Sequence, residues 1–411
     1  MNKEMYRKIW VAIFLLIMFL SVTVLFSCFR NRPTRSQMVV VTRSRQNKPL
    51  PPRRTNWSGL SLECSSWPLN DTFHYNSPVE KQFPIAYVVL IHHQKSKSAV
   101  RQYMRLLKHL YRPQNLICLH IDRKAPEKWI QAIEKFARTC YPKNIIMPKK
   151  SAKVVYASPS TLNAHLVCLK ELLQYNHTWR YVIDLHGTEL PLVTNRDIVE
   201  AFKKANGVNI VPFGTDIGMI DNSTFTYKQI THKAIVSIVD NRIKITDRSL
   251  SSAPYNLTLY KSADGPTSAF SRDFVKFIFS SPKAIALRKY LQDVMSAEEY
   301  FFSTLNNLPE APGGWLKRKQ LNFELPIVST RVFQQNNNNP KICRAKHYRH
   351  NICVVSTSDI NWLEQRSEAR SQFFHNKYIS SYNKGIMDYI ERNLVFRNEN
   401  EEINDYLSVS S

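Results

Sequence analysis

Short apolar runs alternate with amphipathic segments in the region that begins at Phe83. The runs FPIAYVVLIHH, LICLHID and WRYVIDLHG are typical of buried strands, and a shorter strand is predicted at residues 144–147. In the segments between them, apolar residues recur every three or four positions, which is the period of a helix with one buried face. The helices predicted in this way cover residues 98–111, 125–139, 159–175 and 195–206. Because strands and helices of this length alternate, we predict an α/β domain with a parallel or mixed central sheet flanked by helices, in which ligands bind at the carboxyl ends of the strands.

A different pattern comes before this region. Residues 9–29 carry no charge and are mostly apolar, and a helix of this length can cross a hydrocarbon core of about 30 Å. We therefore predict a transmembrane helix. The alternative is a cleaved signal peptide, but its apolar core would be shorter and would end in small residues, whereas this segment ends at Cys28 and Phe29.

The compartment is indicated by sequons and cysteines. Basic residues flank the apolar segment on both sides, and by themselves they favour a cytosolic body. Against this, the chain contains five N-x-S/T sequons that no proline blocks, at Asn56, Asn70, Asn176, Asn222 and Asn256. Six cysteines lie outside the apolar segment, and an even set fits an oxidising compartment. We predict a single-pass type II membrane protein with a lumenal body.

On this interpretation the chain has five parts. Residues 1–8 form a cytoplasmic tail, and residues 9–29 form the signal anchor. Residues 30–80 are rich in Arg, Pro, Ser and Asn and lack apolar periodicity, which is typical of an extended stem. Residues 81–395 form the folded domain, and residues 396–411 form a C-terminal tail.

The chain is strongly basic, with a net charge of +25. Nucleic acid, an anionic membrane surface and a phosphate-bearing substrate are the candidate partners, and a lumenal body excludes nucleic acid. The chain has only nine glycines and contains neither G-x-G-x-x-G nor a Walker loop. It also lacks the D-x-D or E-x-D pair that holds a divalent metal in many sugar-nucleotide enzymes. We therefore expect no metal and no other cofactor, with cationic side chains neutralising a bound diphosphate.

Seven stretches follow one another between residues 83 and 389. They include LLKHLYRPQNLICLHIDRKA, WRYVIDLHGTELPLVTNRDIV, FSRDFVKFI, SAEEYFFSTL, CVVSTSDINWL and FFHNKY. As a series they resemble the core 2/I-branching β-1,6-N-acetylglucosaminyltransferases, glycosyltransferase family 14, which is related to the peptide O-xylosyltransferases. The resemblance implies a GT-A-like nucleotide-sugar-binding fold, inversion at the anomeric carbon, transfer without a metal ion, and a Golgi membrane location.

The stretch SAEEYFFST contains two adjacent carboxylates, Glu298 and Glu299. The resemblance implies that Glu299 is the catalytic base, because it takes the place of the glutamate in the family's SPDEHLWAT-like segment. An inverting single displacement needs a carboxylate that removes the proton of the acceptor hydroxyl as its oxygen attacks. We expect Glu298 to be a solvated carboxylate at a helix start, and the aromatic residues 300–302 to belong to the core.

The resemblance also implies cations that bind the donor diphosphate. Lys377 matches a family lysine in an NKFD-like segment, and fixed cations of this kind stabilise a diphosphate leaving group. The family's arginine has two candidates here, because alignment on Cys353 gives His350 and a slip of one residue gives Arg349. We favour Arg349. If His350 is used instead, activity should fall as the imidazole deprotonates near neutral pH.

Three further residues are expected around the nucleoside. Asp122 takes the family's nucleotide-contacting position at a strand end, and Val89 and Tyr156 are expected to line the pocket around the uracil. A metal site is the alternative function for the histidines near these strand ends, but no carboxylate cluster accompanies them. These histidines are His92, His93 and His120.

The resemblance implies three disulfides, each of which should stabilise the domain by a few kcal/mol. They pair Cys64 with Cys140, Cys118 with Cys168, and Cys343 with Cys353.

Three hypotheses about function remain open. The first is a transferase that moves GlcNAc from UDP-GlcNAc to a glycan hydroxyl in a β-linked branch, β-1,6 as in the family. The second is the same catalyst with UDP-xylose or another UDP-sugar. The third is a catalytically silent Golgi glycan-binding protein, against which the presence of both Glu299 and Lys377 argues. Residues 216–258, on the acceptor side, differ in composition from the family, so the resemblance implies no particular acceptor.

Overall fold

The computed structural model describes residues 62, 64, 77–92, 97–262, 266–334, 343–383 and 385–395. They belong to one compact unit, Thr55–Ser411. The predicted cytoplasmic tail, the signal anchor at residues 9–29, most of the predicted stem and the tail at residues 396–411 lie outside the described residues. Within the described ranges, no helix is both long enough and apolar enough to cross a membrane.

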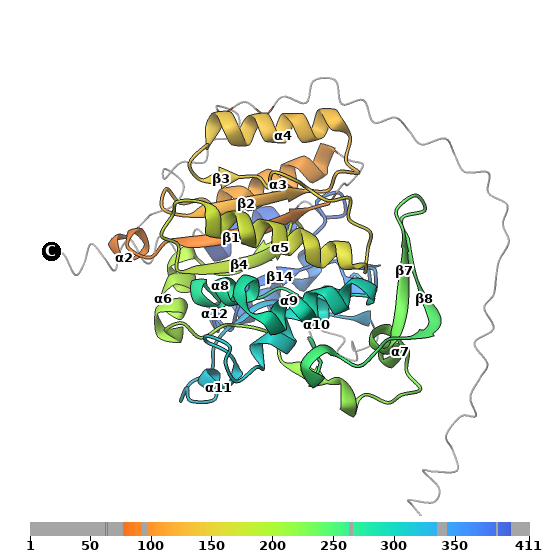
Figure 1. Cartoon of the computed structure of the whole chain (residues 1–411). Coiled ribbons are helices and arrows are strands. Elements are labelled where there is room, and N and C mark those ends of the chain that lie inside the picture. Colours follow the sequence, from red (N-terminus) through yellow and green to blue (C-terminus); the bar gives the residue numbers. More distant parts are fainter. Residues whose placement is uncertain are drawn as a thin grey trace, which may run out of the picture. The chain divides into compact units, whose positions relative to one another are not determined.

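A mixed sheet of five strands lies at the centre, in the order β10-β4-β1-β2-β3 (Figure 1). Its strands are β1 Ile85–Ile91, β2 Leu116–Ile121, β3 Ile145–Ile146, β4 Tyr181–His186 and β10 Ala269–Ser271. β1 pairs in parallel with β2 and β4, β2 pairs in parallel with β3, and β10 is antiparallel at the edge. The predicted mixed sheet and the strands assigned from the apolar runs are confirmed.

Helices cover both faces of this sheet. The helices of the described fold are α2 Pro78–Lys81, α3 Lys97–Leu110, α4 Glu127–Cys140, α5 Pro159–Gln174, α6 Asn195–Ala205, α7 Phe225–Thr231, α8 Arg272–Ser280, α9 Pro282–Tyr290, α10 Ala297–Asn306, α11 Trp315–Arg318, α12 Ile360–Glu368 and α13 Gly385–Ile390. Alternate residues of β1 belong to two hydrophobic clusters, one with α3, α4 and α6 and the other with α5, α8, α9 and α10. Because successive side chains of a strand point to opposite faces, a strand covered on both sides is apolar throughout, and all seven residues of β1 are buried.

Four smaller sheets complete the described fold, in the orders β11-β14-β5, β12-β13, β6-β9 and β7-β8. Their strands are β5 Glu189–Pro191, β6 Gly214–Asp216, β7 His232–Ser237, β8 Arg242–Ser249, β9 Tyr260–Ser262, β11 Ile327–Arg331, β12 Tyr348–Arg349, β13 Ile352–Cys353 and β14 Gln372–Asn376. The described fold also contains the short helical segments η2 Ile217–Met219, η3 Pro254–Asn256, η4 Leu291–Asp293, η6 Thr357–Asp359 and η7 Glu391–Val395. The β7-β8 hairpin stands apart from the helical layers, near the ends of α5 and α10 (Figure 1).

The folded unit begins before residue 81, where the sequence suggested that the stem ends. Helix α2 spans that boundary, and its Glu80 side chain accepts hydrogen bonds from the backbone N–H of Ser77 at 2.8 Å and from the Asn195 side chain at 2.6 Å. Cys64, also assigned to the stem, is bonded to Cys140 in α4. Part of the predicted stem therefore belongs to the domain.

The structure contains all three disulfides that the resemblance implies. They are Cys64–Cys140, Cys118–Cys168 and Cys343–Cys353. The second joins β2 to α5, and the third closes the segment that contains the β12-β13 hairpin. The sequon residues Asn176, Asn222 and Asn256 are exposed, whereas Asn56 and Asn70 lie outside the described residues.

Candidate active site

The predicted base, Glu299, lies in the first turn of α10. This helix starts after Ser296, which has a left-handed backbone (φ 55°) and donates its N–H to the carbonyl of Ala157 at 2.7 Å. That bond holds the start of α10 beside the loop that carries Tyr156. The Glu299 side chain is 27% exposed, and its Oε2 lies 3.5 Å from Nζ of Lys261. A partly open carboxylate at a helix start is placed to accept a proton from a bound hydroxyl.

Glu298 is not the solvated carboxylate that the sequence led us to expect. It is 8% exposed, and its Oε2 has no hydrogen-bond partner in the described structure. Burial, reinforced by the charge of Glu299, raises the pKa of Glu298 to about 8, so this side chain is largely protonated at neutral pH. Sequence adjacency had suggested an acid pair, but helix geometry turns one member inward. The prediction that residues 300–302 belong to the core is confirmed, since all three are at most 1% exposed.

Lys377 follows β14 and is half-buried. Burial, together with the positive charges of Arg331 and then Arg349, lowers the pKa of Lys377 to about 8. The described structure contains no carboxylate within 4.0 Å of the Lys377 ammonium group. The charge of Glu189 acts in the opposite direction but does not outweigh burial and the two arginines. A cation held close to other cations suits an anionic ligand.

Arg331, which the sequence interpretation missed, lies beside Lys377 because of strand pairing. It is the last residue of β11, which runs parallel to β14, and it lies opposite Asn376 in the register. The carbonyl of the following residue, Val332, accepts a hydrogen bond from the N–H of Cys353 at 2.9 Å, which ties the end of β11 to β13. The only available signal was a basic residue at the end of an apolar run, and this signal is weak without the pairing.

Arg349 and His350 lie on the β12-β13 hairpin, and both are exposed. His350 and Asn351 form its two-residue turn, with φ of 52° and 60°. The His350 ring packs on Tyr156, with 4.7 Å between the ring centroids. Burial, followed by the charges of Lys377 and Arg349, lowers the pKa of His350 below its ordinary value of 6.5. The imidazole is therefore neutral at neutral pH, and of the two candidates only arginine supplies a permanent charge.

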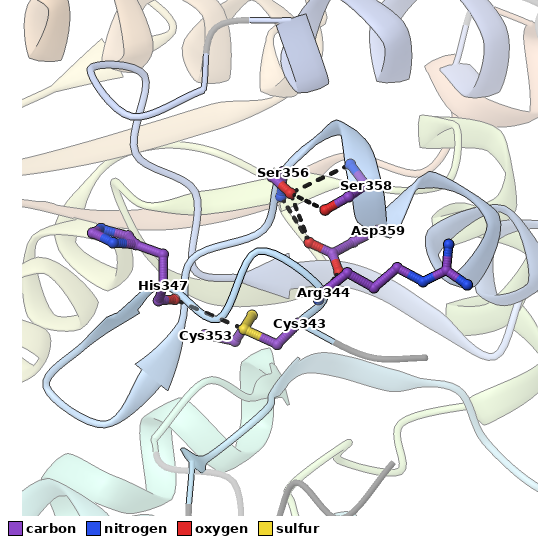
Figure 2. Close-up of a disulfide and its surroundings, with 7 residues drawn as sticks. All are labelled: Cys343, Arg344, His347, Cys353, Ser356, Ser358 and Asp359. Carbon is purple, nitrogen blue, oxygen red and sulfur yellow. Dashed lines mark hydrogen bonds between the residues drawn. A yellow bond between two sulfur atoms is a disulfide. The ribbon is translucent and has the colours of Figure 1, made fainter. Parts of the chain in front are cut away.

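Figure 2 shows how this hairpin is held at its base. The Cys343–Cys353 disulfide closes the segment, and the buried Asp359 carboxylate accepts the N–H of Arg344 at 2.8 Å and the N–H of Ser356 at 3.0 Å. Ser356 and Asp359 form a capping box at the start of η6. Because both ends are fixed, the position of Arg349 and His350 is determined by a covalent and hydrogen-bonded frame.

The residues predicted around the nucleoside differ in their surroundings. Asp122 follows β2, is 4% exposed and accepts the N–H groups of Lys124 and Val154 at 3.0 and 3.2 Å. Tyr156 is 65% exposed and lies with His350. Val89, in contrast, is 1% exposed within β1 and packs in the hydrophobic core, so its side chain does not line the open edge where Tyr156 lies. Because both faces of β1 are covered, every side chain of this strand is buried, whichever face it points to.

The histidines near the strand ends have separate surroundings. Buried His120 accepts the N–H of Ala152 at 3.0 Å, and burial lowers its pKa to about 4. His92 is exposed after β1, and His93 lies outside the described residues. Among the residues that the structure describes, no group of three or more His, Cys, Asp and Glu side chains could hold a metal ion.

Comparisons with known proteins identify the family. Residues 85–364 match the sequence profile of the Core-2/I-Branching enzyme. The chain belongs to this family. Human beta-1,3-galactosyl-O-glycosyl-glycoprotein beta-1,6-N-acetylglucosaminyltransferase 3 is 27% identical over 356 residues, which cover 84% of this chain and 77% of that protein. Mouse N-acetyllactosaminide beta-1,6-N-acetylglucosaminyl-transferase is 30% identical over 304 residues, which cover 74% of this chain and 71% of the mouse protein.

As a Core-2/I-Branching enzyme, the protein is a glycosyltransferase. Among solved structures, residues 1–349 of S. aureus TarS cover 58% of this chain and 67% of that chain, at 12% identity and a TM-score of 0.26, which is too low to bear on fold or function. The matched range includes Glu299 and Arg349 and ends before Lys377.

Proposed function

We propose that this protein is an inverting, metal-independent glycosyltransferase with a GT-A-like fold. It transfers GlcNAc from UDP-GlcNAc to a glycan hydroxyl and forms a β-1,6-linked branch. The observation that supports the proposal is the partly exposed carboxylate of Glu299, whose charge acts on Tyr156. The Tyr156 ring packs on His350, on which the charges of Lys377 and Arg349 act. The donor and the linkage are supported by the relatives, which are named β-1,6-N-acetylglucosaminyltransferases.

The chemistry follows from the charges of these residues. Glu299 removes the proton of the acceptor hydroxyl while that oxygen attacks the anomeric carbon from the side opposite UDP. The bond between the anomeric carbon and the phosphate oxygen breaks, the configuration inverts, and UDP leaves with the bonding electrons. Lys377 and Arg349 neutralise the charge that develops on the diphosphate. Asp122 and Tyr156 contact the nucleoside.

The proposal extends to location. The protein is a single-pass type II Golgi membrane protein, anchored by residues 9–29, with its catalytic domain in the lumen. Three disulfides and three exposed sequon asparagines in the described domain support an oxidising compartment in which proteins are glycosylated.

The base is tested with the Glu299→Gln variant of the lumenal domain. We expect transfer to fall by about 10³-fold, since general base catalysis contributes about 10² to 10⁴, while UDP binds with unchanged affinity in calorimetry. The matched control is Glu310→Gln, which removes an exposed glutamate paired with Lys283 and should retain full activity. Near-normal turnover of Glu299→Gln would contradict the assignment of the base.

The donor is tested with a panel of UDP-sugars. UDP release in the presence of glycan acceptors should be fastest with UDP-GlcNAc. Faster release with UDP-xylose would favour the second hypothesis, a different donor in the same site. UDP binding without release from any donor would favour a silent glycan-binding relative.

A further inference from the structure

Lys261 is held against the proposed base by two elements. It is the central residue of β9, and it lies opposite Thr215 of β6 in an antiparallel register. The preceding N–H, that of Tyr260, donates to Oγ1 of Thr304 in α10 at 3.0 Å. These contacts fix β9 along α10 and place Nζ of Lys261 3.5 Å from Oε2 of Glu299, with side-chain exposures of 23% and 27%.

This ion pair is unexpected for a base that must accept a proton. When Glu299 becomes neutral by taking the proton, Lys261 loses its counterion in a partly enclosed site, which is unfavourable. The structure gives Lys261 no second carboxylate within 4.0 Å among the described residues, and neighbouring Glu298 is largely neutral. A further anion near Lys261 would keep this cation paired after Glu299 has taken the proton.

A second cation lies on the same side of the site. Arg331 has no carboxylate within 4.0 Å among the described residues, although its charge acts on the buried carboxylate of Glu189. It also acts on Tyr156, Glu298 and Lys377. In the proposed reaction, Lys377 and Arg349 already neutralise the diphosphate of the donor. The proposed reaction thus leaves Arg331 and Lys261 without an assigned partner in the donor. Lys261 lies against the carboxylate beside which the acceptor hydroxyl must lie, and the charge of Arg331 acts on Glu298 next to it.

We propose that the acceptor glycan carries a negatively charged substituent, a carboxylate or a sulfate ester, close to the hydroxyl that is glycosylated. This inference rests on the proposed function and names its class of acceptor. When the acceptor binds, Lys261 moves its ion pair from Glu299 to the anionic group of the glycan. Arg331 is the second cation that binds this group. The exchange frees Glu299 to accept the proton and leaves Lys261 with a counterion throughout the reaction.

The test compares neutral and anionic acceptors with the lumenal domain and UDP-GlcNAc. The neutral probes are a β-1,3-galactosyl O-glycoside and N-acetyllactosamine. The anionic probes are the same glycans with a sulfate ester on the galactose in one arm and sialic acid in the other. In at least one anionic arm, we expect kcat/KM to be about tenfold higher or more than for the matching neutral glycan. A hydrogen bond to a charged group contributes enough binding energy for a difference of about this size.

Variants separate recognition of the anion from other roles of Lys261 and Arg331. Lys261→Met should bring the ratio of anionic to neutral kcat/KM close to one, and Lys261→Arg should restore much of it. The control is Lys233→Met, because Lys233 forms the same kind of ion pair, 3.4 Å from the Asp293 carboxylate, outside the site. Lys233→Met should change kcat/KM for neither the neutral nor the anionic acceptors. Arg331→Met should lower the same ratio without weakening UDP binding.

Three results would overturn the inference. One is equal or faster transfer to the neutral glycans by the wild-type protein. Another is an equal loss on neutral and anionic acceptors in Lys261→Met, which would mean that Lys261 only orients the base. A tenfold or greater loss of UDP affinity in Arg331→Met would assign that residue to the donor. Transfer to neutral acceptors alone contradicts only this inference, whereas failure to transfer to every acceptor contradicts the proposed function as well.

Discussion

At the scale of single residues, burial decides which side chains of the site carry charge. Glu298 and Glu299 are adjacent in sequence, yet the Glu298 side chain is buried, with its Oε2 lacking a hydrogen-bond partner among the described residues, and the Glu299 side chain is partly open beside Lys261. Lys377 and His350 both have pKa values lowered by burial and by neighbouring cations. The charge of Lys377, the proposed diphosphate ligand, therefore depends on pH near 8, where a solvated lysine would stay protonated.

This dependence predicts how UDP affinity changes with pH. The Lys377 pKa is about 8, against 10.5 for an ordinary lysine, and the protonated form binds the diphosphate. Affinity should therefore be full below pH 8 and should fall as pH rises above 8, by up to about tenfold per pH unit. Calorimetry with UDP between pH 6.5 and 9.5 measures this. Lys377→Arg should keep its affinity across the range, because arginine does not lose its proton. A flat profile for the wild-type protein would refute the role of Lys377.

At the scale of elements, the site depends on how secondary structures are held together. The start of α10 is fixed by a bond from Ser296 to Ala157, and the hairpin with Arg349 is closed by a disulfide. The C-terminal helix α13 and the following η7 are held to α3 by a cluster of charges. Arg105 donates two hydrogen bonds to Glu391, at 2.7 and 2.6 Å, and forms an ion pair with Asp388 at 2.7 Å.

The cluster around Glu391 predicts the stability of the domain in acid. Burial alone would raise the pKa of Glu391, but hydrogen bonds from His109 and Arg105 outweigh it and lower the pKa to about 2, from an ordinary 4.5. The stabilisation is therefore present above about pH 4.5 and is lost as pH falls towards 2. Glu391→Gln should reduce the free energy of unfolding at pH 7 by up to about 3 kcal/mol, measured by denaturant titration.

A control separates this effect from the loss of any surface charge. Glu310→Gln breaks an exposed ion pair with Lys283 of similar length, 2.7 Å, and should cost less than about 1 kcal/mol. The Glu391→Gln variant should also lose less stability than the wild-type protein between pH 5 and 2. Equal stability of the two variants at pH 7 would argue against a buried charge cluster.

At the scale of the whole molecule, the site gathers cations from distant parts of the chain. Lys261, Arg331, Arg349 and Lys377 come from four different strands or the residues beside them, and the chain as a whole has a net charge of +25. A site with this many cations has less need of a divalent ion to neutralise a diphosphate.

The proposed chemistry therefore predicts transfer without a metal ion. Activity of the purified lumenal domain in excess EDTA should equal its activity with added Mg²⁺ or Mn²⁺ within about twofold, because Lys377 and Arg349 supply the charge that a metal would supply. UDP release is measured in both conditions. A strict requirement for Mn²⁺ would show that side-chain cations do not replace the metal.

Much of the fold could be predicted from local patterns. β1 is a continuous apolar run, and β2 and β4 are mostly apolar, because both of their faces are covered. The amphipathic helices α3, α4 and α6 show their period in the sequence. Within the site, Lys377 and Arg349 were predicted from a resemblance. Lys261 and Arg331 were not, because each reaches the site through the pairing of strands far apart in sequence.

The sequence by itself determined the class of fold, the family and the identity of the proposed base, because apolar periodicity and short motifs are local properties that survive without coordinates. Only the tertiary structure decided which charges meet. It buried Glu298, turned Val89 into the core, stacked His350 on Tyr156 and brought Lys261 to Glu299. The physical reason is that electrostatic interactions depend on distance and burial in space, and neither can be read from the order of residues along the chain.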